Sequence, residues 1–147
     1  MELQEALGDA LVERGEFVAA AESCTGGLIG SLLTDVPGSS DYFDRSIVTY
    51  SYDAKLELLG VPREILDEEG AVSDPVAKQM ARGVRDNAGA NWAVATTGIA
   101  GPTGGTDDKP VGTVYIAFAH AAEWGTGDSW CTARRYVFDG IRPEIKR

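Results

Sequence analysis

Ser23 lies between an apolar segment of the chain and two consecutive glycines. The segment 22–27 reads Glu-Ser-Cys-Thr-Gly-Gly, between the apolar runs 17–21 and 28–33. Unpaired backbone amides at the beginning of a helix can hold a phosphate or the oxyanion of an acyl transfer. A hydroxyl placed beside such amides is a potential nucleophile, so Ser23 is a candidate for covalent catalysis.

Two simpler interpretations of this segment stay open. Ser23 or Thr25 could serve only as a helix N-cap, which is the commoner role of these residue types. Cys24 is a rival nucleophile, although a buried cysteine beside a glycine turn is commonly just a small apolar group. The segment is neither a Walker phosphate loop nor the Gly-x-Ser-x-Gly turn of α/β-hydrolases.

A serine nucleophile needs a base, and the chain has one histidine, His120, which ends an apolar run. That position favours a surface or capping role. A lysine can act as the base if burial lowers its pKa toward neutrality. Lys55 follows Tyr50 closely, and both could leave the end of one strand together. Taken alone, a lysine such as Lys55 is more often a solvated helix residue than a base.

A second glycine-rich loop, 98–105, follows the apolar run 92–97. Loops at strand ends form the usual ligand site of an α/β sheet. Thr97 offers a hydroxyl there, and the glycines offer accessible amides. A purely structural turn is the alternative, but two such loops in one small domain favour a shared pocket.

These segments need a sheet to position them, and the sequence pattern predicts one. Apolar residues at helical spacing in 3–11, with a stop at Gly15, indicate a first helix. A second helix is indicated by Ser73 and Pro75 before a segment that ends near Gly89. The other predicted helices are 28–33 and 54–59, the latter ended by Gly60 and Pro62. The predicted strands are 17–21, 46–50, 92–97, 112–120 and 130–138.

The order of these elements defines the expected architecture. The first half alternates strands and helices, whereas the last two strands form a hairpin turning around Gly125-Thr126-Gly127. This order predicts an α/β fold: a single domain with a mixed β-sheet covered by helices on both faces, in three layers α/β/α.

Composition limits the classes of function. The chain has 147 residues, 44% of them hydrophobic, with a formal net charge of −10. That charge argues against nonspecific nucleic-acid binding. No apolar run approaches the ~20 residues of a membrane helix, and the acidic N-terminus is unlike a signal peptide, so we expect a cytoplasmic protein. Two cysteines and one histidine cannot form a four-ligand zinc site, and we expect no metal or cofactor.

Taken together, the polar segments resemble the CinA C-terminal-domain family, whose single-domain members include nicotinamide-nucleotide amidohydrolases of the PncC type. The similarity runs in consistent order from about residue 20 to 119. The matching segments are 21–27, 34–40, 48–51 with Lys55, 70–73, 97–102 and 109–114.

The resemblance implies a reaction, namely deamidation of nicotinamide mononucleotide to nicotinic acid mononucleotide and ammonia in NAD recycling. It implies Ser23 as nucleophile, Lys55 as its base, and Tyr50 and Thr97 as supporting hydroxyls. It also implies a homo-oligomer that needs no metal. The matching positions expected to bind substrate are Cys24, Thr25, Gly26, Gly27, Gly98, Gly101 and Arg142.

Two departures from the family pattern bear on this expectation. The family often has Gly-Asp-Arg where this chain has Gly140-Ile141-Arg142, and relatives usually continue beyond the position of Arg147 into a C-terminal helix. We therefore expect a single domain over 1–147 that lacks a final helix. The alternative function is a non-catalytic module that binds or senses a nucleotide through the same loops.

Overall fold

The structure is a computed structural model that describes residues 2–122 and 129–147. Its centre is a five-stranded sheet in the order β2-β1-β3-β4-β5. Strand β1 is parallel to both β2 and β3, whereas β3–β4 and β4–β5 are antiparallel. The predicted mixed sheet is thereby confirmed. The strands are β1 (Val18–Glu22), β2 (Phe43–Val48), β3 (Trp92–Gly98), β4 (Thr113–His120) and β5 (Trp130–Val137).

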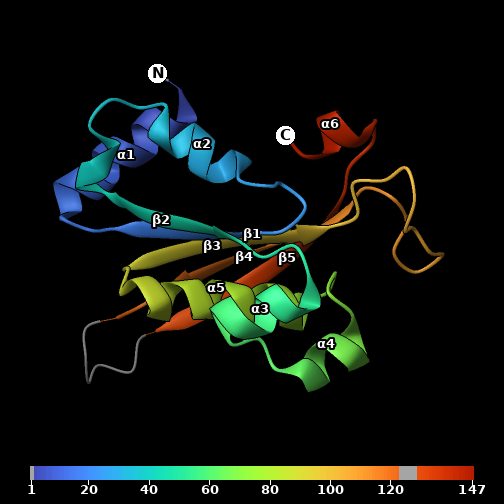
Figure 1. The fold of residues 1–147 in the computed structure, drawn as a ribbon. Helices are drawn as coiled ribbons and strands as arrows, with labels where there is room; N and C mark the ends of the chain where they lie inside the picture. Colours follow the sequence, from blue (N-terminus) through green and yellow to red (C-terminus); the bar gives the residue numbers. More distant parts are fainter. Residues whose placement is uncertain (1, 123–128) are drawn as a thin grey trace.

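Helices cover both faces of the sheet, which confirms the three-layer arrangement (Figure 1). One face carries α1 (Leu3–Arg14) and α2 (Leu28–Thr34). The other carries α3 (Tyr52–Leu59), α4 (Arg63–Glu69) and α5 (Asp74–Ala88). A short 3-10 helix, η1 (Ser39–Asp41), precedes β2, and α6 (Arg142–Ile145) lies near the C-terminus. None of these described helices is both long enough and apolar enough to cross a bilayer.

The main core lies between α5 and the sheet. Helix α5 begins at the N-cap Ser73 and ends at Gly89, as the sequence predicts. Its buried side chains pack on a strand surface built largely of alanines, which lets the helix lie close to the sheet. The buried α5 residues are Val76, Ala77, Met80, Ala81 and Val84; the sheet contributes Ala19, Ala21, Ala93, Ala95, Ala117 and Ala119.

Parallel pairing brings the carboxyl ends of β1, β2 and β3 together along one side of the sheet. Glu22 is in register with Val48 of β2 and with Thr96 of β3. The residues that follow these positions therefore emerge side by side. In an α/β sheet, ligands bind outside the carboxyl ends of the parallel strands, and both glycine-rich segments lie at this edge.

Several predicted boundaries were wrong. Strand β2 runs over Phe43–Val48 rather than 46–50, because the chain leaves the sheet after Thr49 to begin α3. Helices α4 and α6 were not predicted at all. Pro62 is the N-cap of α4 rather than only a stop signal, and Pro143 lies in the first turn of α6. The predicted hairpin turn around Gly125-Thr126-Gly127 lies outside the described residues.

Candidate active site

Ser23 and Lys55 meet at the carboxyl edge of the sheet. The Lys55 Nζ lies 3.0 Å from the Ser23 Oγ. Ser23 directly follows β1, and its amide donates to the Thr96 carbonyl of β3 at 3.1 Å. Lys55 lies on α3 and is fully buried, and Ser23 is nearly so. The sequence predicted both residues as site residues, and the structure brings them into contact.

The environment of Lys55 favours its neutral form. Burial lowers the pKa of its ammonium to about 8. No carboxylate forms an ion pair with it in the part of the chain that the structure describes. Its Nζ also donates to the backbone carbonyls of Thr49, at 2.7 Å, and Tyr50, at 3.3 Å. A substantial fraction of this lysine is therefore neutral near pH 8.

Three features of the surrounding structure position Lys55 beside Ser23. The Thr49 amide donates to the Glu22 carbonyl at 2.8 Å, which holds the chain at the end of β2 against β1. Ser51 then caps α3, accepting from the Ala54 amide at 3.0 Å. At the C-terminal end of α3, a Cβ at Gly83 would lie 2.2 Å from the Leu59 carbonyl oxygen. Only glycine permits this close packing of α3 on α5.

A buried glutamate occupies the amides at the beginning of α2. Glu22 accepts hydrogen bonds from the amides of Gly27, Ile29 and Gly30. These amides are therefore not free for a ligand. Within the described residues, the amides of Cys24 and Thr25 donate no hydrogen bond to another residue. Glu22 was not predicted as a site residue, although a carboxylate between an apolar run and a glycine turn was a visible signal.

Tyr50 and Arg142 form a pair at the surface of the site. The Arg142 guanidinium donates to the Tyr50 hydroxyl and to the Gly101 carbonyl, both at 2.7 Å. The phenol of Tyr50 is 62% exposed, and its backbone carbonyl rather than its hydroxyl contacts Lys55. Arg142 thus joins α6 to the second glycine loop and to the end of β2.

Thr97 and Gly98 lie at the end of β3 with separate local partners. The buried Thr97 hydroxyl donates to the Ala71 carbonyl at 2.8 Å. No hydrogen bond joins it to Ser23 or Lys55 among the residues described. A Cβ at Gly98 would lie 2.8 Å from the Thr113 carbonyl oxygen and 3.1 Å from the Cys24 sulfur. Gly98 therefore permits tight packing against the glycine turn of residues 23–27.

Cys24 is the alternative nucleophile and His120 the alternative base. The environment of the first and the position of the second do not favour these roles. Burial raises the pKa of the Cys24 thiol, which packs with Ala100, Val114 and Ile145. His120 ends β4, where it pairs with Trp92 at the beginning of β3. Ser23 follows the opposite end of the sheet. Over residues 2–122 and 129–147, no group of three or more His, Cys, Asp or Glu side chains could hold a metal ion.

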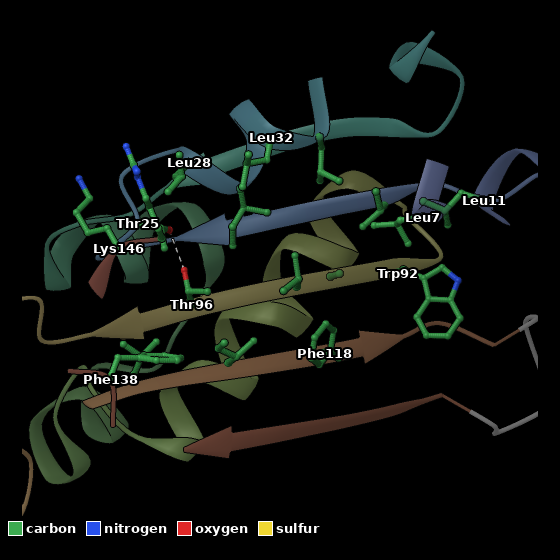
Figure 2. A pocket seen from close by; sticks show the side chains of 18 of the residues that line it. Leu7, Leu11, Thr25, Leu28, Leu32, Trp92, Thr96, Phe118, Phe138 and Lys146 are labelled. Atoms are coloured by element: carbon green, nitrogen blue, oxygen red, sulfur yellow. Dashed lines mark hydrogen bonds between the residues drawn. The ribbon is translucent and has the colours of Figure 1, made fainter. Parts of the chain in front are cut away.

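An apolar groove lies beside this centre, not at it. A groove of about 680 Å³ runs between α1, α2 and the uncovered face of β3 and β4 (Figure 2). Its walls are apolar, with Leu7, Leu28, Leu32 and Phe118 among the lining residues. Neither Ser23 nor Lys55 lines it.

The glycine turn of residues 23–27 borders a smaller and more polar pocket. It has a volume of about 400 Å³ and adjoins the glycines of the turn. Because this pocket offers polar groups and two cations, it suits a charged ligand better than the apolar groove does. Its lining residues are Thr25, Gly26, Gly27, Leu28, Ser31, Pro143, Lys146 and Arg147.

The fold and these motifs define one family. A model of the CinA C-terminal domain matches residues 1–147, and the chain belongs to this family. It is 48% identical over 147 residues to the nicotinamide-nucleotide amidohydrolase PncC of Escherichia coli K12. That match covers 100% of this chain and 86% of the Escherichia coli protein.

Longer relatives carry the same region as a minor part. A CinA-like protein of Chlorobium limicola is 61% identical over 117 residues, or 80% of this chain, but the match spans only 27% of that protein. Among solved structures, the competence/damage inducible protein CihA of Agrobacterium tumefaciens superposes with a TM-score of 0.90 at 43% identity. This superposition covers 98% of this chain and 84% of the Agrobacterium chain.

Proposed function

We propose that this chain hydrolyses the carboxamide of nicotinamide mononucleotide, producing nicotinic acid mononucleotide and ammonia. The observation that carries the proposal is the buried Lys55 Nζ at 3.0 Å from the Ser23 hydroxyl. The full-length similarity to a protein named nicotinamide-nucleotide amidohydrolase supports the choice of substrate. We further propose that it acts in the cytoplasm as a homo-oligomer within the pyridine nucleotide cycle, without metal or cofactor.

The first step is proton transfer from Ser23 to neutral Lys55. A neutral amine has two hydrogens and one lone pair. The carbonyls of Thr49 and Tyr50 accept hydrogen bonds only, so they can take the two hydrogens. The lone pair is then left for the Ser23 hydroxyl. As Lys55 takes the proton, the Ser23 Oγ attacks the carboxamide carbon.

The amides of Cys24 and Thr25 are the proposed donors to the resulting oxyanion. They directly follow the nucleophile, and within the described chain they donate no hydrogen bond to another residue. The protonated Lys55 then gives its proton to the leaving nitrogen, and the C–N bond breaks to release ammonia. An ester between Ser23 and the nicotinoyl group remains.

Hydrolysis of the ester reverses the proton path. Neutral Lys55 accepts a proton from water, whose oxygen attacks the ester carbon. The same two amides stabilise the second oxyanion. Collapse breaks the bond to the Ser23 Oγ, which recovers its proton from Lys55, and the acid leaves.

The remaining expected site residues surround this centre. We propose that the exposed Arg142 binds the substrate phosphate, because a guanidinium suits phosphate oxygens. The Gly26–Gly27 turn and the Gly98–Gly101 loop would provide close backbone approach. Tyr50 and Thr97 are proposed to hold these loops in place rather than to transfer protons.

The direct test is incubation of the purified chain with nicotinamide mononucleotide. Ammonia and nicotinic acid mononucleotide should appear in equal amounts, and Ser23→Ala should produce neither. Saturable binding of the nucleotide without either product would instead identify a binding or sensing module. A substrate lacking the amide nitrogen, nicotinic acid mononucleotide itself, serves as the control for ammonia release.

A further inference from the structure

We propose that Glu22 is a positioning residue, which fixes the nucleophile turn in the geometry that aims the Ser23 hydroxyl and the Cys24 and Thr25 amides. This inference rests on the proposed function. It concerns a group that does not touch the reacting atoms. Glu22 precedes the nucleophile and points into the opposite side of the turn, toward α2 and β2.

The carboxylate joins four parts of the chain. Its Oε1 accepts from the Thr25 hydroxyl at 2.7 Å, the Gly27 amide at 3.2 Å and the Ile29 amide at 2.9 Å. Its Oε2 accepts from the Gly30 amide at 3.0 Å and from the Ser46 hydroxyl of β2. The turn from 23 to 30 is therefore wrapped around one carboxylate.

Thr25 extends this network to the strand on the other side of β1. Its hydroxyl lies 3.0 Å from the Thr96 hydroxyl of β3 (Figure 2). The Thr96 carbonyl also accepts from the Ser23 amide. The chain of contacts from Glu22 through Thr25 to Thr96 thus holds both ends of the nucleophile turn against β3.

Charge makes Glu22 difficult to replace. It is fully buried and forms no ion pair within the described residues. Burial alone would raise its pKa, but hydrogen bonds from Ser46, Thr25, Ile29 and Gly30 lower it below the usual value. All five partners of the carboxylate act as donors. A neutral glutamine would place its NH₂ against one of these donors and push the turn away.

A purely structural glutamate would affect stability but not the chemical step. Substrate contacts formed outside the turn would survive a displaced turn, whereas the oxyanion donors would lose their aim. Because the Gly26–Gly27 turn is itself a proposed substrate contact, the expected signature is a fall in kcat that clearly exceeds any rise in KM. Loss of one oxyanion donor lowers kcat on the order of 100-fold, which sets the expected size.

The experiment compares Glu22→Gln with wild type in the amidase assay. We expect kcat to fall on the order of 100-fold while KM rises by a much smaller factor. Ser73→Ala, which removes the cap of α5, is the control: it should lower the melting temperature without lowering kcat. A Glu22→Gln protein with a lower melting temperature but wild-type kcat would overturn the proposal.

Thr25 provides a second test if Glu22→Gln does not fold. Thr25→Ser keeps the hydroxyl between Glu22 and Thr96 and should keep most of the turnover, whereas Thr25→Ala should reproduce the fall in kcat. Equal turnover of these two variants would contradict the proposal.

A substrate-independent probe separates this inference from the proposed function. Labelling of Ser23 by a fluorophosphonate requires an aimed nucleophile but no nucleotide. If the wild type labels but does not deamidate the nucleotide, the proposed substrate is wrong. Slower labelling of Glu22→Gln than of wild type would then still support the Glu22 proposal, and equal labelling would contradict it.

Discussion

The Nζ of Lys55 lies 3.0 Å from the hydroxyl of Ser23, across 32 positions of the chain. The pair depends on the parallel register of β1 with β2, since Ser23 follows one strand and α3 begins just after the other. Both residues are buried, and the lysine has only backbone carbonyls as its other partners. This arrangement gives a lysine the environment that a general base needs.

Ser23→Ala should abolish deamidation while the nucleotide still binds. Loss of the nucleophile should lower kcat by about 1,000-fold or more. Cys24→Ser is the matched neighbour, because its thiol is buried in a small apolar cluster and its raised pKa keeps it protonated. It should retain turnover. A dead Cys24→Ser protein beside an active Ser23→Ala protein would transfer the nucleophile role to Cys24.

Lys55→Arg should be nearly as inactive as Lys55→Ala. Arginine keeps the charge but has no accessible neutral form at working pH. The wild-type rate should rise with pH through about 8, where Lys55 becomes neutral. Rates measured from pH 6 to 9.5 check this. Substantial turnover by Lys55→Arg with an unchanged pH profile would show that Lys55 supplies only charge.

Lys55 should also leave a signature in stability. Its pKa is lowered from 10.5 to about 8 in the folded state, so unfolding takes up a proton between these values. The cost of burying the charge is full below pH 8 and is relieved as pH rises toward 10.5. The free energy of unfolding of wild type, relative to Lys55→Met, should therefore increase by about 3 kcal/mol across this window.

Urea unfolding of both proteins at pH 7 and pH 10 measures that change. Taking the difference between them cancels the titration of all other groups that behave alike in the two proteins. A pH-independent difference would mean that Lys55 has the same pKa in the folded and unfolded chains.

Arg142→Ala should weaken the nucleotide more than the corresponding nucleoside. The exposed guanidinium already holds Tyr50 and Gly101, so its loss also loosens the second glycine loop. Tyr50→Phe removes only one of these contacts and serves as the control. KM values for the phosphorylated and unphosphorylated substrates separate the two effects. Equal changes for both substrates would assign Arg142 a structural role alone.

EDTA should leave the activity unchanged, because the proposed steps need only Ser23, Lys55 and backbone amides. Activity is measured before and after dialysis against the chelator. A loss that a defined divalent metal restores would require a different mechanism.

The sequence predicted the elements whose signals are local. Apolar runs ended by glycines located β1 and β3, and the N-cap Ser73 located the beginning of α5. Lys55 could be named as a candidate, but its burial depends on the packing of α3 on α5 at Gly83, which no local pattern reports. Helix α4 was missed because Pro62 was interpreted only as a stop signal.

The partners of site residues were harder to predict than the residues themselves. Arg142 was named, but its hydrogen bond to Tyr50 spans 92 positions. Glu22 was not named, because its role depends on distant partners such as Ser46, which lies 24 positions away in the chain. Such pairings depend on strand register, and register is decided by the whole sheet rather than by a short segment.

Because the Ser23–Lys55 hydrogen bond joins the end of the interior strand β1 to α3, which follows the edge strand β2, activity and global stability need not fail together. In the described sheet β2 pairs with β1 alone, whereas β1 pairs on both sides. Edge elements open locally at a smaller free-energy cost than interior strands. An opening of β2 and α3 would carry Lys55 away from the nucleophile while β1, β3 and β4 stay paired. On warming, turnover would decline before circular dichroism detects global unfolding. Loss of activity would therefore report the local opening of β2 and α3.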